Sequence, residues 1–129
     1  QAGMAFGLIR DCIAIIKEVE GQLGHVNRFL DDQAAALEET LAGLEAELAA
    51  LAADPYVEGD AYFRRVVAAR LAAGEASVAA ANAALLHCGA RGYVAAHRCQ
   101  RRLREAYFVA IVTPATKQLR LMLDQLPAA

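Results

Sequence analysis

The sequence predicts an all-α protein, an antiparallel four-helix bundle (up-down-up-down) with a short C-terminal fifth helix. Apolar residues make up 57% of the 129 residues, aromatic residues only 6%, and tryptophan is absent. This excess of small and aliphatic side chains is typical of closely packed helices rather than of a β-sandwich. No segment alternates apolar and polar residues with the period of a strand, whereas several repeat apolar residues every three or four positions. The length fits one domain, residues 1–129.

The first helix is expected over residues 2–20. Its apolar face consists of side chains three or four positions apart, namely Phe6, Ile9, Ile13 and Ile16. Gly21 and Gly24 follow closely, and glycine is a common stop signal for a helix. We therefore expect this helix to end at "EGQLGH".

The second helix has the most regular pattern. Asp31 or Asp32 can cap its start, and Asp54-Pro55 marks its end. Between these limits leucines alternate spacings of four and three, at Leu37, Leu41, Leu44, Leu48 and Leu51. Such a heptad-like seam indicates either a contact with another chain or an intramolecular core.

The third helix is expected over residues 60–88. Its apolar stripe contains Phe63, Val66, Val67, Leu71, Val78, Ala81, Leu85 and Leu86. Asn82 lies on the same stripe and would need a hydrogen-bond partner if it were buried. Many alanines in residues 68–84 would allow neighbouring helices to approach closely.

Two further helices are expected after the glycine-flanked break at residues 89–92. The fourth covers about residues 93–112. Thr113 and Pro114 then fit the N-cap and the first position of a fifth helix. This last helix should end near Leu126-Pro127.

Charge and cysteine content narrow the class of protein. The net charge of −2 argues against a nucleic-acid partner. Three cysteines, Cys12, Cys88 and Cys99, form no disulfide framework, so we expect reduced thiols and a cytoplasmic location. No segment is apolar and long enough to span a membrane. Because the chain starts with Gln1 rather than methionine, we expect it to be part of a larger protein.

Two clusters of residues are candidates for binding sites. His87, Cys88, His97 and Cys99 have the spacing H-C-x8-H-x-C, which matches no standard zinc site, so we expect no metal and interpret them as residues of helix ends and core. The arginines at 91, 98, 101, 102 and 104 would spread around a helix. A solvated face, a phosphate site and a subunit contact remain open for them.

Several motifs occur in a characteristic order. They are "QAGMAFGLIRDCIAII", "QLG" at residues 22–24, "FLDDQAAALEETLAGLEAEL", "LHCGARGY" and "RRLREAYFVAIVTPATKQLR". Together they resemble the C-terminal helical domain of the acyl-CoA dehydrogenase family over nearly the whole chain. The resemblance implies a flavoprotein with an N-terminal helical domain and a middle β-domain, FAD between the middle domain and this bundle, and self-association as a dimer or tetramer. In that family an acyl-CoA thioester loses a proton to a carboxylate base and a hydride to the flavin.

The resemblance also implies site residues. Candidate cofactor-binding positions, carried over by motif, are Gln22, Gly89, Gly92, Tyr93, Arg101, Arg104 and Thr116. The family's catalytic glutamate falls at Thr113, which cannot act as the base, so no catalytic residue is expected in this chain. Departures at flavin-contact positions are Glu20, Leu86 and Ala90, which replace an arginine, a glutamine and a glycine.

Two alternatives stay open. "CQRRLREAY" is similar to a segment of the related flavin-dependent monooxygenases, which share the fold and do not need the glutamate base. The chain could also be a non-catalytic helical assembly module. In each case the isolated domain is expected to be inactive.

Overall fold

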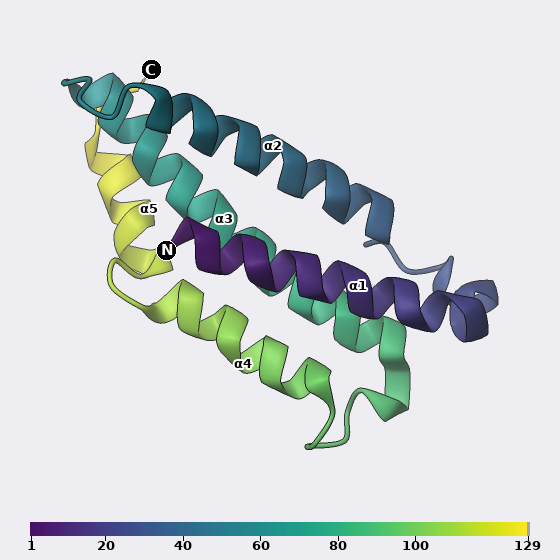
Figure 1. Ribbon diagram of the computed structural model, residues 1–129. Helices are drawn as coiled ribbons and strands as arrows, with labels where there is room; N and C mark the ends of the chain where they lie inside the picture. The colour runs from purple at the N-terminus through teal and green to yellow at the C-terminus, as the bar shows by residue number, and fades with distance from the viewer. Residues whose placement is uncertain (129) are drawn as a thin grey trace.

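The computed structural model describes residues 1–128, and most of these residues lie in helices (Figure 1). The helices are α1 (Ala2–Asn27), α2 (Ala34–Ala53), α3 (Asp60–Cys88), α4 (Arg98–Ile111) and α5 (Thr116–Gln125), with the 3-10 turn η1 (Gly89–Arg91) between α3 and α4. Because no strand occurs in residues 1–128, the predicted all-α class is confirmed. The bounds expected for the third helix are those of α3.

Helices α1 and α3 form the centre of the structure. Each contacts the other, and both are contacted by α2 and by α4. In Figure 1, α2 runs along one side of this pair and α4 along the other, while α5 packs on α3 near the N-terminus. One hydrophobic cluster draws buried residues from α1, α2, α3 and α4.

The buried faces of α3 consist mainly of small residues. They are Ala73, Gly74, Ser77, Ala80, Ala81, Ala83 and Ala84. Opposite them α1 supplies larger side chains, among them Ile9 and Ile16. Short side chains on one helix let its neighbours approach closely, which explains how α3 can contact four other helices at once.

The apolar stripe expected on α3 is partly wrong. Phe63, Val66 and Leu86 are exposed, because α3 buries its alanine faces instead. Asn82 is also exposed and therefore needs no buried hydrogen-bond partner.

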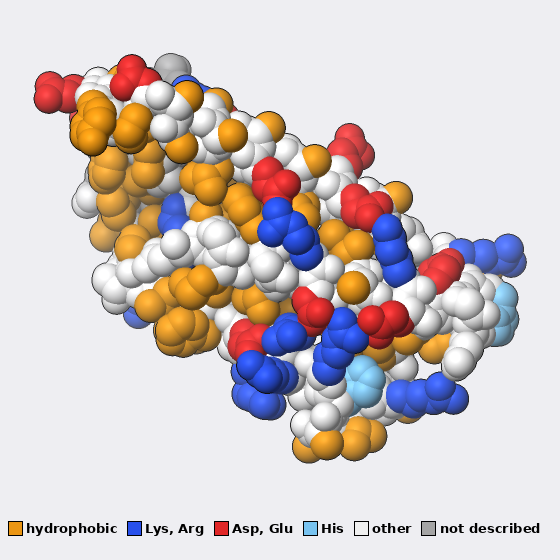
Figure 2. Space-filling view, viewed as in Figure 1, with side chains coloured by type: hydrophobic (Ala, Val, Ile, Leu, Met, Phe, Trp, Pro, Cys, Tyr) orange, Lys and Arg blue, Asp and Glu red, His pale blue; other side chains and the backbone are white. Residues whose placement is uncertain are grey.

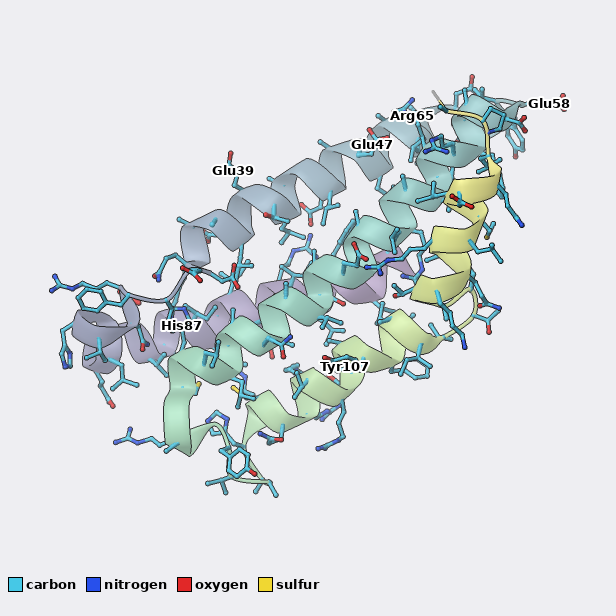
Figure 3. All side chains as sticks on the ribbon, turned by 180° about the vertical axis from the view of Figure 1, so that it is seen from behind. Glu39, Glu47, Glu58, Arg65, His87 and Tyr107 are labelled. Carbon is cyan, nitrogen blue, oxygen red and sulfur yellow. The ribbon has the colours of Figure 1, made fainter. Side chains whose placement is uncertain are left out.

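The leucine seam of α2 faces the interior of this chain. Leu37, Leu41 and Leu51 are buried, while Leu44 and Leu48 are partly buried against the core. Of the two roles left open for the seam, the structure therefore supports the intramolecular one. Ion pairs flank it, such as Arg65 of α3 with Glu47 of α2 at 3.0 Å (Figure 3).

The first helix is longer than expected. Gly21 and Gly24 lie inside α1, which continues to Asn27. Asn27 is buried and its Nδ2 donates to the carbonyl of His87 at 3.0 Å, a tertiary contact that outweighs the low helix propensity of the glycines. The N-cap of α2 is Gln33 rather than Asp31 or Asp32.

The ends of the last two helices also differ from expectation. The fourth helix was expected to start at residue 93, but α4 starts at Arg98 because η1 and the turn after it occupy the intervening residues. Thr113 and Pro114 lie in the α4–α5 connection, and Ala115 is the N-cap of α5. The carbonyl oxygen of the Gln118 side chain accepts from the Ala115 N–H at 2.7 Å, and this contact stabilises the first turn. Across residues 1–128, no helix combines the length and the hydropathy needed to cross a bilayer.

Candidate functional site

Most of the candidate cofactor positions lie near one end of α1 or the other, whereas Arg101 and Arg104 lie on α4, whose Arg102 contacts Asp11 in the middle of α1. Arg91 Nη1 donates to Gln22 Oε1 at 3.1 Å, which places Gln22 beside the α3–α4 corner. At the other end, Gln1 Nε2 donates to the carbonyl of Thr113 at 2.8 Å. A helix rises 1.5 Å per residue, so residues 1 and 22 are about 30 Å apart. The candidate positions therefore do not form one compact site within a single chain.

The α3–α4 corner depends on two glycines. Gly89 ends α3 with φ of +60°, a conformation that favours glycine. Gly92 is buried against the end of α3, where an added Cβ would lie 2.8 Å from Cys88 Cβ. Gln100 Nε2 donates to the carbonyl of Gly92 at 2.9 Å and ties the corner to α4. Tyr93, which follows, is exposed.

Part of the arginine cluster forms ion pairs between α4 and α1. Arg98 binds Asp11 at 2.7 Å and Glu18 at 2.9 Å, and Arg102 binds Asp11 as well as Glu105. Figure 2 shows such acidic and basic side chains in contact across this face. The hydrogen bond from Arg98 is the largest cause that lowers the pKa of Asp11. Arg98 and Arg102 therefore join α4 to α1 through ion pairs.

The two arginines named as cofactor candidates are more accessible. Arg101 binds Glu105 at 2.7 Å through an exposed side chain. Arg104 is exposed and forms no ion pair with any residue in 1–128. If this face binds an anion, Arg101 and Arg104 are the side chains left to do so.

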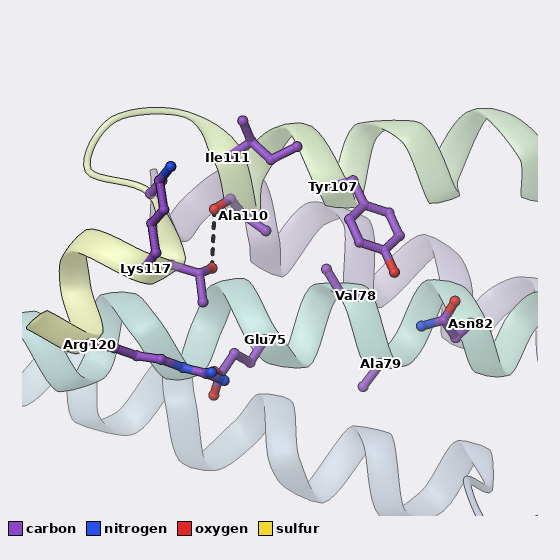
Figure 4. A pocket seen from close by; sticks show the side chains of 11 residues that line it. Glu75, Val78, Ala79, Asn82, Tyr107, Ala110, Ile111, Lys117 and Arg120 are labelled. Carbon is purple, nitrogen blue, oxygen red and sulfur yellow. Dashed lines mark hydrogen bonds and ion pairs between the residues drawn. The ribbon is translucent and has the colours of Figure 1, made fainter.

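An open groove of about 960 Å³ lies between α3, α4 and α5 (Figure 4). Its lining residues are Glu75, Val78, Ala79, Asn82, Tyr107, Ala110, Ile111, Ala115, Thr116, Lys117 and Arg120. Thr116 is the one candidate position among them, and its Oγ1 donates to the carbonyl of Ala110 at 3.1 Å. Arg120 binds Glu75 at 2.5 Å across the groove.

The groove was not found from the sequence. A usable signal existed on α3, because Glu75, Val78, Ala79 and Asn82 follow the i, i+3, i+4, i+7 spacing of one helical face. The apolar stripe expected on this helix contains Val78 and Asn82, but neither Glu75 nor Ala79. Helix α5 covers only part of this face of α3. Its polar and apolar side chains therefore line the wall of the groove.

Three of the four residues weighed as zinc ligands come together. The ligand atoms of Cys88, His97 and Cys99 all lie within 4.8 Å of one another. Cys99 Sγ donates to Cys88 Sγ at 3.5 Å, and His97 Nδ1 accepts from the Cys99 N–H at 3.2 Å. Both thiols are buried, and burial raises the pKa of Cys99 to about 12.

The fourth residue, His87, lies apart from this group. Its Nε2 donates to the carbonyl of Asp32 at 2.8 Å, next to the α1–α2 connection (Figure 3). Its Nδ1 is buried and has no hydrogen-bond partner in residues 1–128. His87 and Cys88 are adjacent but contact different residues, Asp32 and Cys99, because neighbouring side chains on a helix point in different directions.

Comparison with protein-family models, with curated proteins and with solved structures found no match to this chain.

Proposed function

We propose that this chain is the C-terminal, FAD-facing and oligomerisation domain of an acyl-CoA dehydrogenase-like flavin oxidoreductase that acts on an acyl-CoA thioester. The order of the sequence motifs suggests this assignment, and the order of the helices agrees with it. We infer that α1 to α4 form an antiparallel four-helix bundle, to which α5 is added. Short connections between long neighbouring helices support this topology.

The groove between α3, α4 and α5 is the observation that carries the proposal. An acyl-CoA joins an apolar chain to anionic phosphates. Val78 and Ile111 supply apolar walls, and Lys117 supplies a cationic side chain at the α5 side, whereas the charge of Arg120 is paired with Glu75. The α4–α5 connection, which contains Thr113 where the family has its base, leads directly into the lining residues Ala115 and Thr116.

The groove suits binding better than proton abstraction. Its one carboxylate, Glu75, is held in an ion pair with Arg120. A catalytic base needs to be desolvated and close to the carbon that it deprotonates. We therefore assign the groove to holding the thioester substrate, and we place the base outside this chain. Since the candidate flavin contacts lie at both ends of α1, other domains or subunits must complete the FAD site.

Substitutions in the groove test the binding role. Ile111→Asp should weaken binding of a medium-chain acyl-CoA at least tenfold in calorimetric titration, because burying an aliphatic side chain contributes about 1.5–3 kcal/mol. Leu121→Asp is the matched control, since Leu121 is similarly exposed on the neighbouring α5 but does not line the groove. Equal affinities of the two variants would contradict the proposal.

The flavin chemistry is tested separately on the full-length gene product. Its visible absorption spectrum is recorded before and after anaerobic addition of acyl-CoAs. A flavin spectrum that bleaches supports the dehydrogenase. A flavin that stays oxidised favours the related flavin-dependent monooxygenase, which would use the same domain.

A non-catalytic assembly module is the remaining candidate. It is favoured by large apolar side chains exposed on α4, namely Tyr107, Phe108 and Ile111. It cannot use the leucine seam, which is buried within the chain. A folded full-length protein that contains no flavin, binds no acyl-CoA and self-associates would support this candidate.

A further inference from the structure

We propose that Cys88, His97 and Cys99 form a three-ligand site for a thiophilic divalent cation, with zinc as the best match. The site is separate from the groove and does not depend on flavin. Its ligands come from the end of α3 and the start of α4, on either side of the corner that contains η1.

The corner holds the three ligands together through contacts of its own. Cys88 is the last residue of α3, His97 is the N-cap of α4, and Cys99 lies in its first turn. Between them, the Gly92 N–H donates to the carbonyl of Gly89 at 3.0 Å, and the His97 N–H donates to that of Val94 at 2.8 Å. The site is thus preorganised, and a cation would not have to gather ligands from a flexible loop.

The distance between the two sulfur atoms suits tetrahedral coordination, and the His97 ligand atom lies within 4.8 Å of both. Two thiolates bound to zinc at about 2.3 Å in a tetrahedral arrangement lie about 3.8 Å apart. The sulfur atoms of Cys88 and Cys99 are 3.5 Å apart. Binding would therefore exchange an S–H···S hydrogen bond for two metal–sulfur bonds, release two protons to solvent and move the sulfur atoms by only a few tenths of an ångström.

The chemistry of the donors selects the cation. Two thiolates and one imidazole favour zinc and other soft transition metals over magnesium and calcium, which prefer oxygen ligands. Both cysteines are buried, whereas His97 is only half-buried and gives the site a side open to solvent. A Cys2His set leaves one tetrahedral position for water or an external ligand, as in zinc sites that are not purely structural.

The spacing of these residues along the chain does not predict a metal site. Standard zinc motifs place two to four residues between the paired ligands of each half. Here only one residue separates His97 from Cys99, and the second thiol, Cys88, comes from the end of the preceding helix through the corner. Spacing rules describe ligand pairs on one turn or knuckle, so they do not cover ligands collected from two helix ends.

The test uses reduced, chelator-treated protein titrated with Co²⁺ and then Zn²⁺ without oxygen. We expect one equivalent of Co²⁺ to give the intense visible bands of tetrahedral coordination with a thiolate-to-cobalt charge-transfer band, and one equivalent of Zn²⁺ to remove them. Cys88→Ser and Cys99→Ser should each lose the charge-transfer intensity of one thiolate. Cys12→Ser is the matched control, because Cys12 is also buried but lies outside the cluster.

A second variant avoids any loss of folding. His97→Asn removes the imidazole, while asparagine remains a good N-cap for α4. Changes outside the ligand shell alone weaken metal affinity about 10–100-fold, so loss of a ligand should weaken it at least 100-fold, with an unchanged circular dichroism spectrum. His25→Ala, at an exposed histidine of α1, should leave affinity unchanged.

Three results would overturn the proposal. The first is a folded protein with reduced thiols that gives no thiolate–cobalt band. The second is binding that persists unchanged in His97→Asn or in Cys99→Ser. The third is binding that is lost in His25→Ala, since this would identify an adventitious surface site.

Discussion

Replacing Gly92 by alanine should destabilise the fold by about 1–2 kcal/mol, because steric overlap outweighs the effect of alanine on the unfolded chain. Gly92 has φ of −65° and ψ of −22°, a conformation that alanine adopts without strain. The added Cβ, however, would lie 2.8 Å from Cys88 Cβ and 3.1 Å from Leu85 Cδ1. The Cys88 Cβ is attached directly to the backbone of α3, so it cannot move away as the end of a long side chain would.

Two opposing effects set the magnitude. Overpacking at a well-packed position costs about 1–3 kcal/mol. Alanine also restricts the unfolded chain, which stabilises the native state by about 0.4–1 kcal/mol. The difference corresponds to a fall in Tm of about 4–8 °C for a chain of this length.

Thermal unfolding followed by circular dichroism measures this effect. Gly43→Ala is the control, because Gly43 lies inside α2 with nothing within 4 Å of an added Cβ, and it should stabilise by about 0.5–1 kcal/mol. A Gly92→Ala variant as stable as the native chain would refute the reasoning. That result would show that the corner is looser than its distances imply, and a flavin contact would then be the remaining reason to need glycine there.

Two further stability predictions concern the ion pairs and the core. Asp11→Asn should cost about 1 kcal/mol at pH 7 after allowance for solvent screening, and Glu38→Gln less than about 0.5 kcal/mol, because the pair of Glu38 is more exposed. Arg98 holds the folded-state pKa of Asp11 below 3.8, so the difference between native and Asp11→Asn proteins in urea unfolding should persist above about pH 4 and vanish as the pH falls through that lowered pKa. In urea unfolding, Leu41→Ala should lower the free energy of unfolding by about 2–5 kcal/mol, because Leu41 is buried. Leu121→Ala should change it by no more than about 0.5 kcal/mol, because Leu121 is exposed. Neither variant should change the elution volume in gel filtration. A shift caused by Leu41→Ala alone would contradict the intramolecular role of the leucine seam and indicate that it contacts another chain.

Long periodic segments could be predicted from the sequence, whereas helix ends could be predicted only where a strong local signal marks them. The bounds of α3 were predicted correctly, since Asp60 follows a turn and Gly89 ends the run. The predicted end of α1 was wrong. Gly21 and Gly24 are weak local stop signals, and the helix continues to Asn27, whose hydrogen bond to His87 joins residues far apart in the sequence. No pattern within α1 reports a partner that far along the chain.

The candidate site also depends on contacts between residues that are far apart in the sequence. Motif order supplied Thr116, but nothing local indicated that Glu75 and Arg120 would face each other over a groove. The thiols of Cys88 and Cys99 come close only because the corner reverses the chain between them. Single positions could be named from the sequence, whereas the sets they belong to depend on how the helices are joined.

The small residues along the interior of α3 have a consequence for how this chain tolerates mutation. In most cores, truncation of large side chains causes the greatest loss, but Ala73, Ala80 and Ala84 are fully buried and have almost nothing to lose. Any larger side chain there must push a neighbouring helix outward. In a library of single variants at these positions of α3, stability should therefore fall with the size of the new side chain rather than with its polarity. Serine should often be accepted at these positions, while leucine should be excluded.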